Sequence, residues 1–318
     1  MYPELTSLAV APSGDLWIAG SGGLVRRWDG ACWTVERIDD GVALDAVWAA
    51  GDDDVWVGGH RTIGPPRPGL FRRRGGAWTP YEALEVRAIW GASATEAWAT
   101  GWGPGELLAW DGERWSRWAG VEARLRRLFG VARDDVWAAG EDDDGGCVLH
   151  WDGRSWRRVA SEPTARFGDI GSARVGEAWV VDRSQGRLAK VTAEGWTFES
   201  APFDVCSMGR LPGELCVAGA LEIAFLEDGR WRTEALSAGD PVTIEVDADG
   251  HASSVGPCFL DGVATSHGEL WAIGNAIVHG MESTAEGFRG ALFRRRAETG
   301  WAPVELPAAT TYGLSGLK

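Results

Sequence analysis

Residues 123–163 read ARLRRLFGVARDDVWAAGEDDDGGCVLHWDGRSWRRVASEP and contain four short runs separated by turn-forming residues. The runs are LRRLFGV, DVWAAG, CVLHW and SWRRVA, and each has the length of a β-strand. Asp152 and Gly153 lie between the last two runs, where glycine adopts a positive φ without steric cost. The stretch therefore predicts a four-stranded antiparallel unit of about 40 residues.

This layout recurs along the chain and is marked by two columns of tryptophan. The first column lies in the second run of each unit, and its members are Trp17, Trp56, Trp98, Trp137, Trp179, Cys216 (which replaces Trp) and Trp271. The second column lies at the start of the fourth run, with members Trp33, Trp78, Trp115, Trp156, Trp196, Trp231 and Trp301. Seven members in each column predict seven units.

Repeated four-stranded units of this length are typical of a β-propeller. We therefore expect one all-β domain, a seven-bladed β-propeller of four-stranded antiparallel blades, with six or eight blades as the alternatives. One such sheet cannot bury either face alone, so neighbouring blades must pack together, and tryptophan fills the space between them. The expected blades span about 5–41, 42–84, 85–122, 123–163, 164–202, 203–236 and 258–307. The segment 237–257 is expected to be an inserted hairpin.

The composition restricts the classes of partner. The net charge of −15 would repel nucleic acid and anionic membranes, so neither is expected as a partner. The five cysteines have no metal-ligand spacing, and their odd number indicates a reducing, cytoplasmic location. The first residues, MYPELTSLAV, do not resemble a signal peptide, and no apolar run approaches the ~18 residues of a membrane span. We expect no cofactor and no bound metal.

The repeats resemble those of bacterial propeller proteins rich in Trp and Gly. Residues 5–34, LTSLAVAPSGDLWIAGSGGLVRRWDGACWT, are similar to the repeats of two-component-regulator sensor propellers. The DGxxW motif resembles the end of an Asp-box, and the spacing of Trp and Gly is similar to tectonin-type lectin repeats. The resemblance implies ligand sensing, sugar binding or protein docking, and it supplies no catalytic residues.

One face of the expected propeller carries connections of very different lengths, and we call it the variable face. Its long loops are expected at 60–69, 140–147, 237–257 and 275–290. Loops longer than a connection requires often carry function. Three histidines on these loops, His60, His251 and His279, are candidate ligand-binding residues, and the alternative is that they are solvent-exposed.

Charged residues also gather near the start of each innermost strand, at the mouth of the central channel. Arg87, Arg126 and Arg127 are expected opposite Asp45 and Asp261, which would make the mouth polarised. A guanidinium group there suits a carboxylate or a phosphate, which it binds with two parallel hydrogen bonds. The alternative is a water-filled channel whose ion pairs neutralise one another.

A further candidate is Trp102, in the sequence GWGPGE on the same face. It offers an apolar wall or a ring on which a sugar stacks.

Catalytic motifs are absent from the sequence. We find no GxSxG, HExxH, Walker loop or dinucleotide fingerprint, so no catalytic residue is assigned and enzymatic activity stays undecided. We expect a non-catalytic binding or scaffolding propeller that docks a protein or peptide through the variable face. The first alternative is a lectin-like or small-molecule-binding propeller with a carbohydrate or small acidic ligand at the channel mouth. The second is a propeller hydrolase or lyase.

Overall fold

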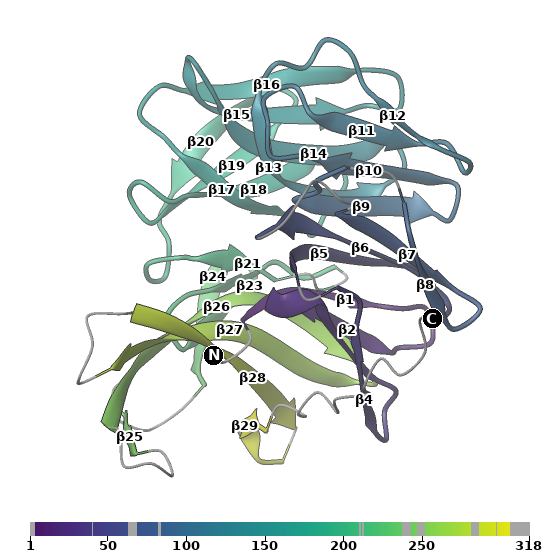
Figure 1. Cartoon of the computed structure of the whole chain (residues 1–318). Coiled ribbons are helices and arrows are strands. Elements are labelled where there is room, and N and C mark those ends of the chain that lie inside the picture. Colours follow the sequence, from purple (N-terminus) through teal and green to yellow (C-terminus); the bar gives the residue numbers. More distant parts are fainter. Residues whose placement is uncertain are drawn as a thin grey trace.

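The structure is a computed structural model, and it consists of seven antiparallel sheets arranged as a ring (Figure 1). It describes residues 4–39, 41–62, 69–81, 84–209, 211, 213–236, 243–246, 252–280, 286–296 and 298–305. Within each sheet the strands follow one another in chain order, and the innermost strands of consecutive blades contact each other. The predicted seven-bladed propeller is therefore confirmed, and the alternatives of six and eight blades are wrong.

The first four blades are formed by the amino-terminal half of the chain. Blade 1 contains β1 (Leu5–Val10), β2 (Leu16–Gly20), the 3₁₀ helix η1 (Ser21–Gly23), β3 (Leu24–Trp28) and β4 (Trp33–Arg37). Blade 2 contains β5 (Val42–Gly51), β6 (Asp54–Arg61), β7 (Leu70–Arg74) and β8 (Ala77–Pro80). Blade 3 contains β9 (Ala88–Ser93), β10 (Glu96–Thr100), β11 (Leu107–Trp110) and β12 (Trp115–Arg117). Blade 4 contains β13 (Arg124–Ala132), β14 (Asp135–Asp142), β15 (Gly145–Trp151) and β16 (Trp156–Glu162).

The remaining three blades are less regular in strand length. Blade 5 contains β17 (Phe167–Gly171), β18 (Glu177–Asp182), β19 (Arg187–Thr192) and β20 (Gly195–Glu199). Blade 6 contains β21 (Ser207–Met208), β22 (Cys216–Ala218), β23 (Glu222–Glu227) and β24 (Arg230–Ala235). Blade 7 contains β25 (Thr243–Val246), β26 (Ala252–Ser266), β27 (Glu269–Gly280), β28 (Glu286–Arg296) and β29 (Gly300–Val304). The last sheet thus has a fifth strand, β25, added beside its innermost strand.

The expected long loop at 140–147 is a β-hairpin, so that expectation was wrong. The strands β14 and β15 stay paired until Asp142 lies opposite Gly145. Gly145 has a φ of 111°, which closes the turn, and the Asp142 carboxylate accepts the Asp144 N–H at 3.0 Å. Continued pairing satisfies backbone groups that an open loop would leave to water.

The same correction applies at 275–290. The strands β27 and β28 pair from Asn275 opposite Gly290 outward to His279 opposite Glu286. Residues 281–285, and residues 63–68 of the expected loop 60–69, lie outside the described residues. At 237–257, β25 pairs with the first residues of β26, so this hairpin continues directly into the innermost strand of blade 7.

The two tryptophan columns meet between blades. All seven first-column side chains are buried, and each packs against the second-column tryptophan of the next blade around the ring. Ring pairs are Trp17–Trp78, Trp56–Trp115, Trp98–Trp156, Trp179–Trp231 and Trp271–Trp33, with centroids 5.1–6.3 Å apart. Trp137 shares a cluster with Trp196, and Cys216 shares one with Trp301. One packing rule therefore joins all seven interfaces.

An acidic and a basic side chain lie beside the first-column tryptophan in five blades. An acidic residue two positions before Trp binds a basic side chain on the next strand, and that side chain lies opposite the Trp and near its ring. The sets are Asp15–Trp17–Arg27, Asp54–Trp56–Arg72, Asp135–Trp137–His150, Glu177–Trp179–Lys190 and Glu269–Trp271–Arg294. The sets with Arg or Lys make cation–π contacts with the indole, and the His150 ring stacks on Trp137.

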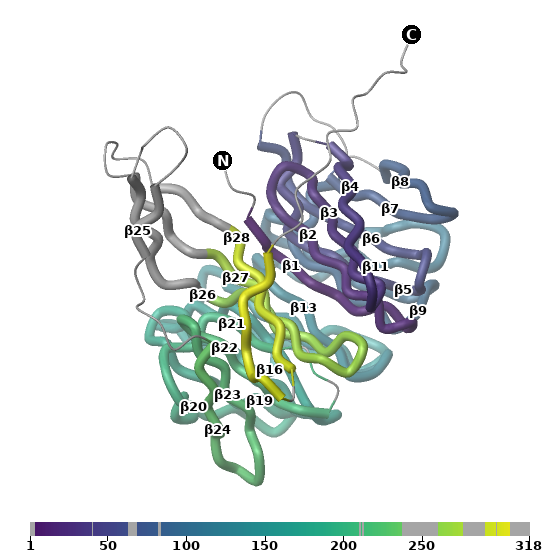
Figure 2. Tube along the Cα trace, turned by 90° about the horizontal axis from the view of Figure 1, so that it is seen from below, coloured from purple at the N-terminus to yellow at the C-terminus, as the bar shows by residue number. Residues whose placement is uncertain are grey.

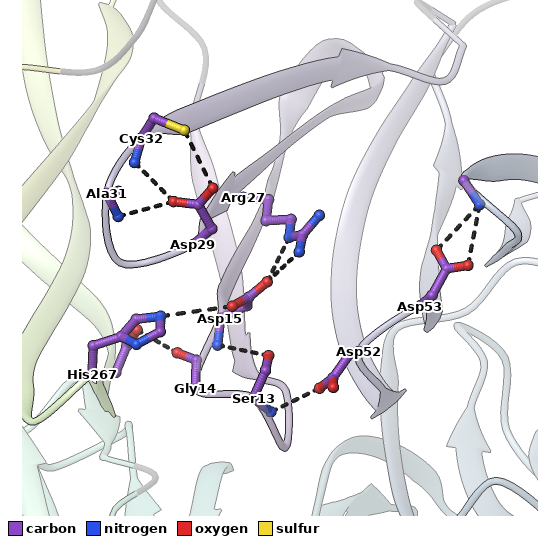
Figure 3. A network of polar contacts seen from close by, with 12 residues as sticks. Ser13, Gly14, Asp15, Arg27, Asp29, Ala31, Cys32, Asp52, Asp53 and His267 are labelled. Atoms are coloured by element: carbon purple, nitrogen blue, oxygen red, sulfur yellow. Dashed lines mark hydrogen bonds and ion pairs between the residues drawn. The ribbon is translucent and has the colours of Figure 1, made fainter.

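Blades 7 and 1 close the ring without exchanging a strand (Figure 2). The Asn275 side chain accepts the Leu5 N–H at 3.0 Å and donates to the Leu5 carbonyl at 2.7 Å. On the opposite face, Asp15 contacts Arg27 of its own blade and His267 of blade 7 (Figure 3). Ser13 donates its N–H to Asp52 of blade 2. Blade 1 is thus tied to both of its neighbours.

Replacing Trp271 with Ala should lower the free energy of unfolding by about 3–5 kcal/mol, because the indole is fully buried between the closing blades. Chemical denaturation measures the change. Trp102→Ala is the control, because this residue belongs to none of the hydrophobic clusters in the described part of the chain. An equal loss in the two variants would contradict the packing rule.

Candidate functional site

A pocket lies where the innermost strands converge, and we call it the axial pocket. It is lined by residues of six blades: Thr6, Ser7, Leu8, Asp45, Ala46, Arg87, Ala88, Ile89, Arg127, Asp169, Asp261 and Gly262. The space in it open to the centre of a water molecule is about 20 Å³. That is room for one or two ordered waters, at roughly 10–15 Å³ each. The pocket therefore admits a small terminal group and excludes a sugar ring.

The pocket opens on the variable face. Two residues that contact its charged groups belong to segments of that face: His60 lies in 60–69 and Asn275 in 275–290. Glu141, in 140–147, binds Arg126 beside the pocket.

Arginines of blades 3 and 4 form the basic side of the pocket. Arg126 binds Glu141 with 2.6 Å between Nη2 and Oε1. The Arg127 Nε lies 3.8 Å from Asp169 Oδ1, and its Nη1 donates to the Arg126 carbonyl at 3.2 Å. Arg87 differs from both, because its guanidinium has no hydrogen bond or ion pair with any described residue. It lies over the Trp102 ring, 4.5 Å from the centroid.

The electrostatic surroundings of Arg87 are unfavourable to its charge. Partial burial, together with the like charges of Arg126 and Arg127, lowers the pKa of its guanidinium to about 10. Asp45 and Glu141 act in the opposite direction without bonding to it. Arg87 therefore remains charged at neutral pH but is poorly compensated.

Aspartates of blades 2, 5 and 7 form the acidic side. Asp45 Oδ2 lies 2.6 Å from His60 Nδ1, and burial raises the pKa of this carboxyl despite that hydrogen bond. Asp261 is open to the water of the pocket but has protein on most sides. The resulting loss of solvation raises its pKa to about 6, against the opposing effect of the Asn275 amide, which donates to Oδ2 at 2.7 Å.

Asp169 is held differently, by the backbone. Its Oδ1 accepts the Ile170 N–H at 3.0 Å and its Oδ2 accepts the Met208 N–H at 2.8 Å. Because both oxygens already have backbone donors, the contact with Arg127 is long and leaves that guanidinium with unused donors. No partner of the Arg127 Nη2 lies among the described residues.

Trp102 connects the two sides of the pocket. The His60 ring meets it edge-on with centroids 4.6 Å apart, while Arg87 lies over its face. The indole N–H of Trp102 is buried and has no acceptor in the described residues. Trp102 thus positions both a ring that binds Asp45 and the unpaired guanidinium.

The structure brings together six of the nine residues chosen from the sequence. Asp45, Arg87, Arg127 and Asp261 line the axial pocket, and His60 and Trp102 contact them. Arg126 lies beside the pocket and is neutralised by Glu141. His279 lies in β27, but its side chain and the whole of His251 are outside the described residues.

Sequence reasoning missed Asp169, Glu141 and Asn275. When the innermost strands are aligned, Asp169 occupies the same position as Arg127. The alignment therefore indicated that Asp169 could lie near the axis. Glu141 and Asn275 were counted only as parts of long loops.

Within the ranges that the structure describes, no group of three or more His, Cys, Asp or Glu side chains is placed to hold a metal ion. None of the described helices has the length and apolar character required to cross a bilayer.

Comparison with known proteins adds information on the fold. No family model matches the sequence, and neither does any curated protein. The structure is similar to "YCF48 bound to D1 peptide", with a TM-score of 0.58, 15% identity, and coverage of 80% of this chain and 91% of that chain. It is also similar to a catalytically inactive virginiamycin B lyase from Staphylococcus aureus with Quinupristin, with a TM-score of 0.60, 11% identity, and coverage of 90% and 94%.

A third similar structure bears on the expected resemblance. It is the extracellular domain of the putative hybrid two component system BT3049 from B. thetaiotaomicron, with a TM-score of 0.56, 14% identity, and coverage of 96% of this chain and 52% of that chain. The resemblance to two-component propellers thus extends to the fold. A family of Trp/Gly-rich repeats has no support from the sequence comparisons.

Replacing His60 with Ala should raise the pKa of Asp45, because the variant loses the hydrogen bond that favours the carboxylate and keeps part of the burial that disfavours it. Titration of the side-chain carboxyl by carbon NMR measures the shift. His150→Ala is the matched control, since it breaks a similar pair with Asp135 in another blade. An Asp45 titration that is the same in all three proteins would show that His60 does not stabilise the carboxylate.

Proposed function

We propose that this protein is a non-catalytic binding propeller that docks a protein or peptide through the variable face, with the axial pocket at the centre of the contact. Propellers bury their tryptophans in blade packing, so their connections are left free to vary and to bind. A peptide partner is supported by the structural similarity to a propeller bound to a peptide.

The state of Arg87 carries this proposal. Most half-buried arginines of the described chain have an acidic partner, among them Arg61, Arg73 and Arg126. Arg26 also has donors without partners, but it is 2% exposed and cannot reach a ligand. Arg87 is half-buried, faces the pocket and has a lowered pKa. A chain with a net charge of −15 that leaves this guanidinium unpaired is suited to an acceptor from outside.

The contacts of Trp102 favour a peptide over a carbohydrate. A sugar needs an open indole face on which to stack, but Arg87 already covers one face and His60 packs against the ring. The small volume of the pocket is also unsuited to a sugar ring. The lectin-like alternative therefore has less support than peptide docking.

A proton-transfer enzyme is the second candidate, and the His60–Asp45 pair favours it. If the His60 Nδ1–H donates its hydrogen bond to Asp45, His60 Nε2 carries a lone pair and can act as a base. One similar structure is a lyase. Chemical change of a bound ligand by the wild type, lost in His60→Ala, would support this candidate over docking alone.

Screening an unbiased peptide library against the purified protein tests the proposed function. We expect Arg87→Ala to weaken binding of the selected peptides by about 10- to 100-fold, the usual effect of losing a hydrogen bond to a charged group. Isothermal titration calorimetry measures the dissociation constants.

The control for this experiment is Arg232→Ala. Arg232 is exposed and binds Glu227 and Glu234 in blade 6, and it does not line the axial pocket. Affinity should be unchanged in this variant. A library without binders, or binders that tolerate Arg87→Ala, would contradict docking at the axial pocket.

A further inference from the structure

Two guanidinium groups in the axial pocket have unused donors, and both point to the same kind of ligand. Arg87 has no acidic partner among the described residues, and Arg127 has only a long contact with an aspartate that the backbone already satisfies. The two charges repel each other, which is one reason that the pKa of Arg87 is lowered. An anion placed between them would relieve this repulsion and fill the open donor positions.

The pocket also limits what the anion can be. Its space for one or two waters is enough for the two oxygens of a carboxylate. Asp45, Asp169 and Asp261 also line the pocket. Three carboxyl groups at short range repel a doubly charged phosphate more strongly than a singly charged group.

We propose that the axial pocket is a binding site for a single carboxylate, held by Arg87 and Arg127. This inference rests on the proposed function, because the docked peptide supplies the carboxylate, from its C-terminus or from an acidic side chain.

Two of the aspartates that line the pocket, Asp261 and Asp45, make the site sensitive to pH. Asp261 has a pKa of about 6, and the pKa of Asp45 is also raised. Above pH 6 the charged Asp261 opposes a second carboxylate, and below it the protonated group no longer does. The groups that face these two aspartates are Arg87, Arg127, Asp169, Arg183, Cys206, His60 and the Asn275 amide. Binding should therefore tighten as the pH falls from 7.5 to 5.5, a range in which the ligand carboxylate stays charged.

The test uses the full-length protein with peptides from the library, each compared with two uncharged versions. One has an amidated C-terminus, and the other has Asn and Gln in place of Asp and Glu. One of the two uncharged versions should bind wild type about 10-fold or more weakly than the parent peptide does. The same version and its parent should bind Arg87→Ala with similar affinity. The arm that loses affinity identifies the source of the carboxylate.

The pH series uses Asp261→Asn as its comparison. Wild-type affinity should rise several-fold between pH 7.5 and 5.5. The variant should bind more tightly than wild type at pH 7.5 and change little with pH. Affinity that is independent of pH in wild type would contradict the role given to Asp261.

A probe without a peptide separates the two proposals. Sodium acetate added to the wild-type protein should shift the NMR signals of the Arg87 and Arg127 Nε–H groups at lower concentration than sodium phosphate, and acetamide should shift neither. Peptide binding that ignores both neutral substitutions would overturn the carboxylate site and leave docking intact. Acetate binding without any peptide binder would overturn peptide docking and leave the carboxylate site intact. Preference for phosphate would overturn the assignment of a carboxylate.

Discussion

The contact between an indole ring of one blade and the tryptophan of the next blade is the interaction on which this structure depends. A four-stranded sheet has two faces to bury, and in this chain seven equivalent interfaces bury them with the same pair of columns. Because the contact repeats around the ring, it fixes the angle between blades and brings the starts of the innermost strands together on the axis. The charged groups of the axial pocket are neighbours for this reason, although they come from five blades.

A second repeated device supports the first. In five blades an acidic and a basic side chain pair beside the buried indole, and in blades 3 and 6 the residue opposite the first-column position is apolar, Ala109 or Phe225. Where it is present, the pair covers the ring and neutralises its own charges. The axial pocket differs, because Arg87 covers Trp102 and has no acidic partner in the described part of the chain. The paired basic side chains beside the first-column tryptophans have a structural role. Arg87 differs from them in this respect, and for that reason we propose it as a binding group.

The number of blades was predictable from the sequence, since Trp recurs at one strand position and needs no knowledge of contacts. The convergence of Asp45, Arg87 and Asp261 was predictable for the same reason, because these residues occupy aligned positions of innermost strands. In blade 4 the aligned residue is Arg126, but the next residue, Arg127, lines the pocket. The basic side chains beside the indoles were not predictable from the sequence. Their distance from Trp along the chain varies from 10 residues for Trp17–Arg27 to 23 for Trp271–Arg294, because it depends on the length of the intervening turn. The hairpin at 140–147 was mistaken for a loop because its acidic run resembles one.

The case for a ligand depends on Arg87 having no acidic partner among the residues that the structure describes. A double-mutant cycle between Arg87 and Asp45, measured on the free energy of unfolding, tests it most directly, with the well-paired Arg72 and Asp54 as the reference. The account predicts a coupling below about 0.5 kcal/mol for the first pair and above about 1 kcal/mol for the second. A coupling between Arg87 and Asp45 as large as that of the reference would mean that the guanidinium is already satisfied, and the case for a ligand in the axial pocket would fail.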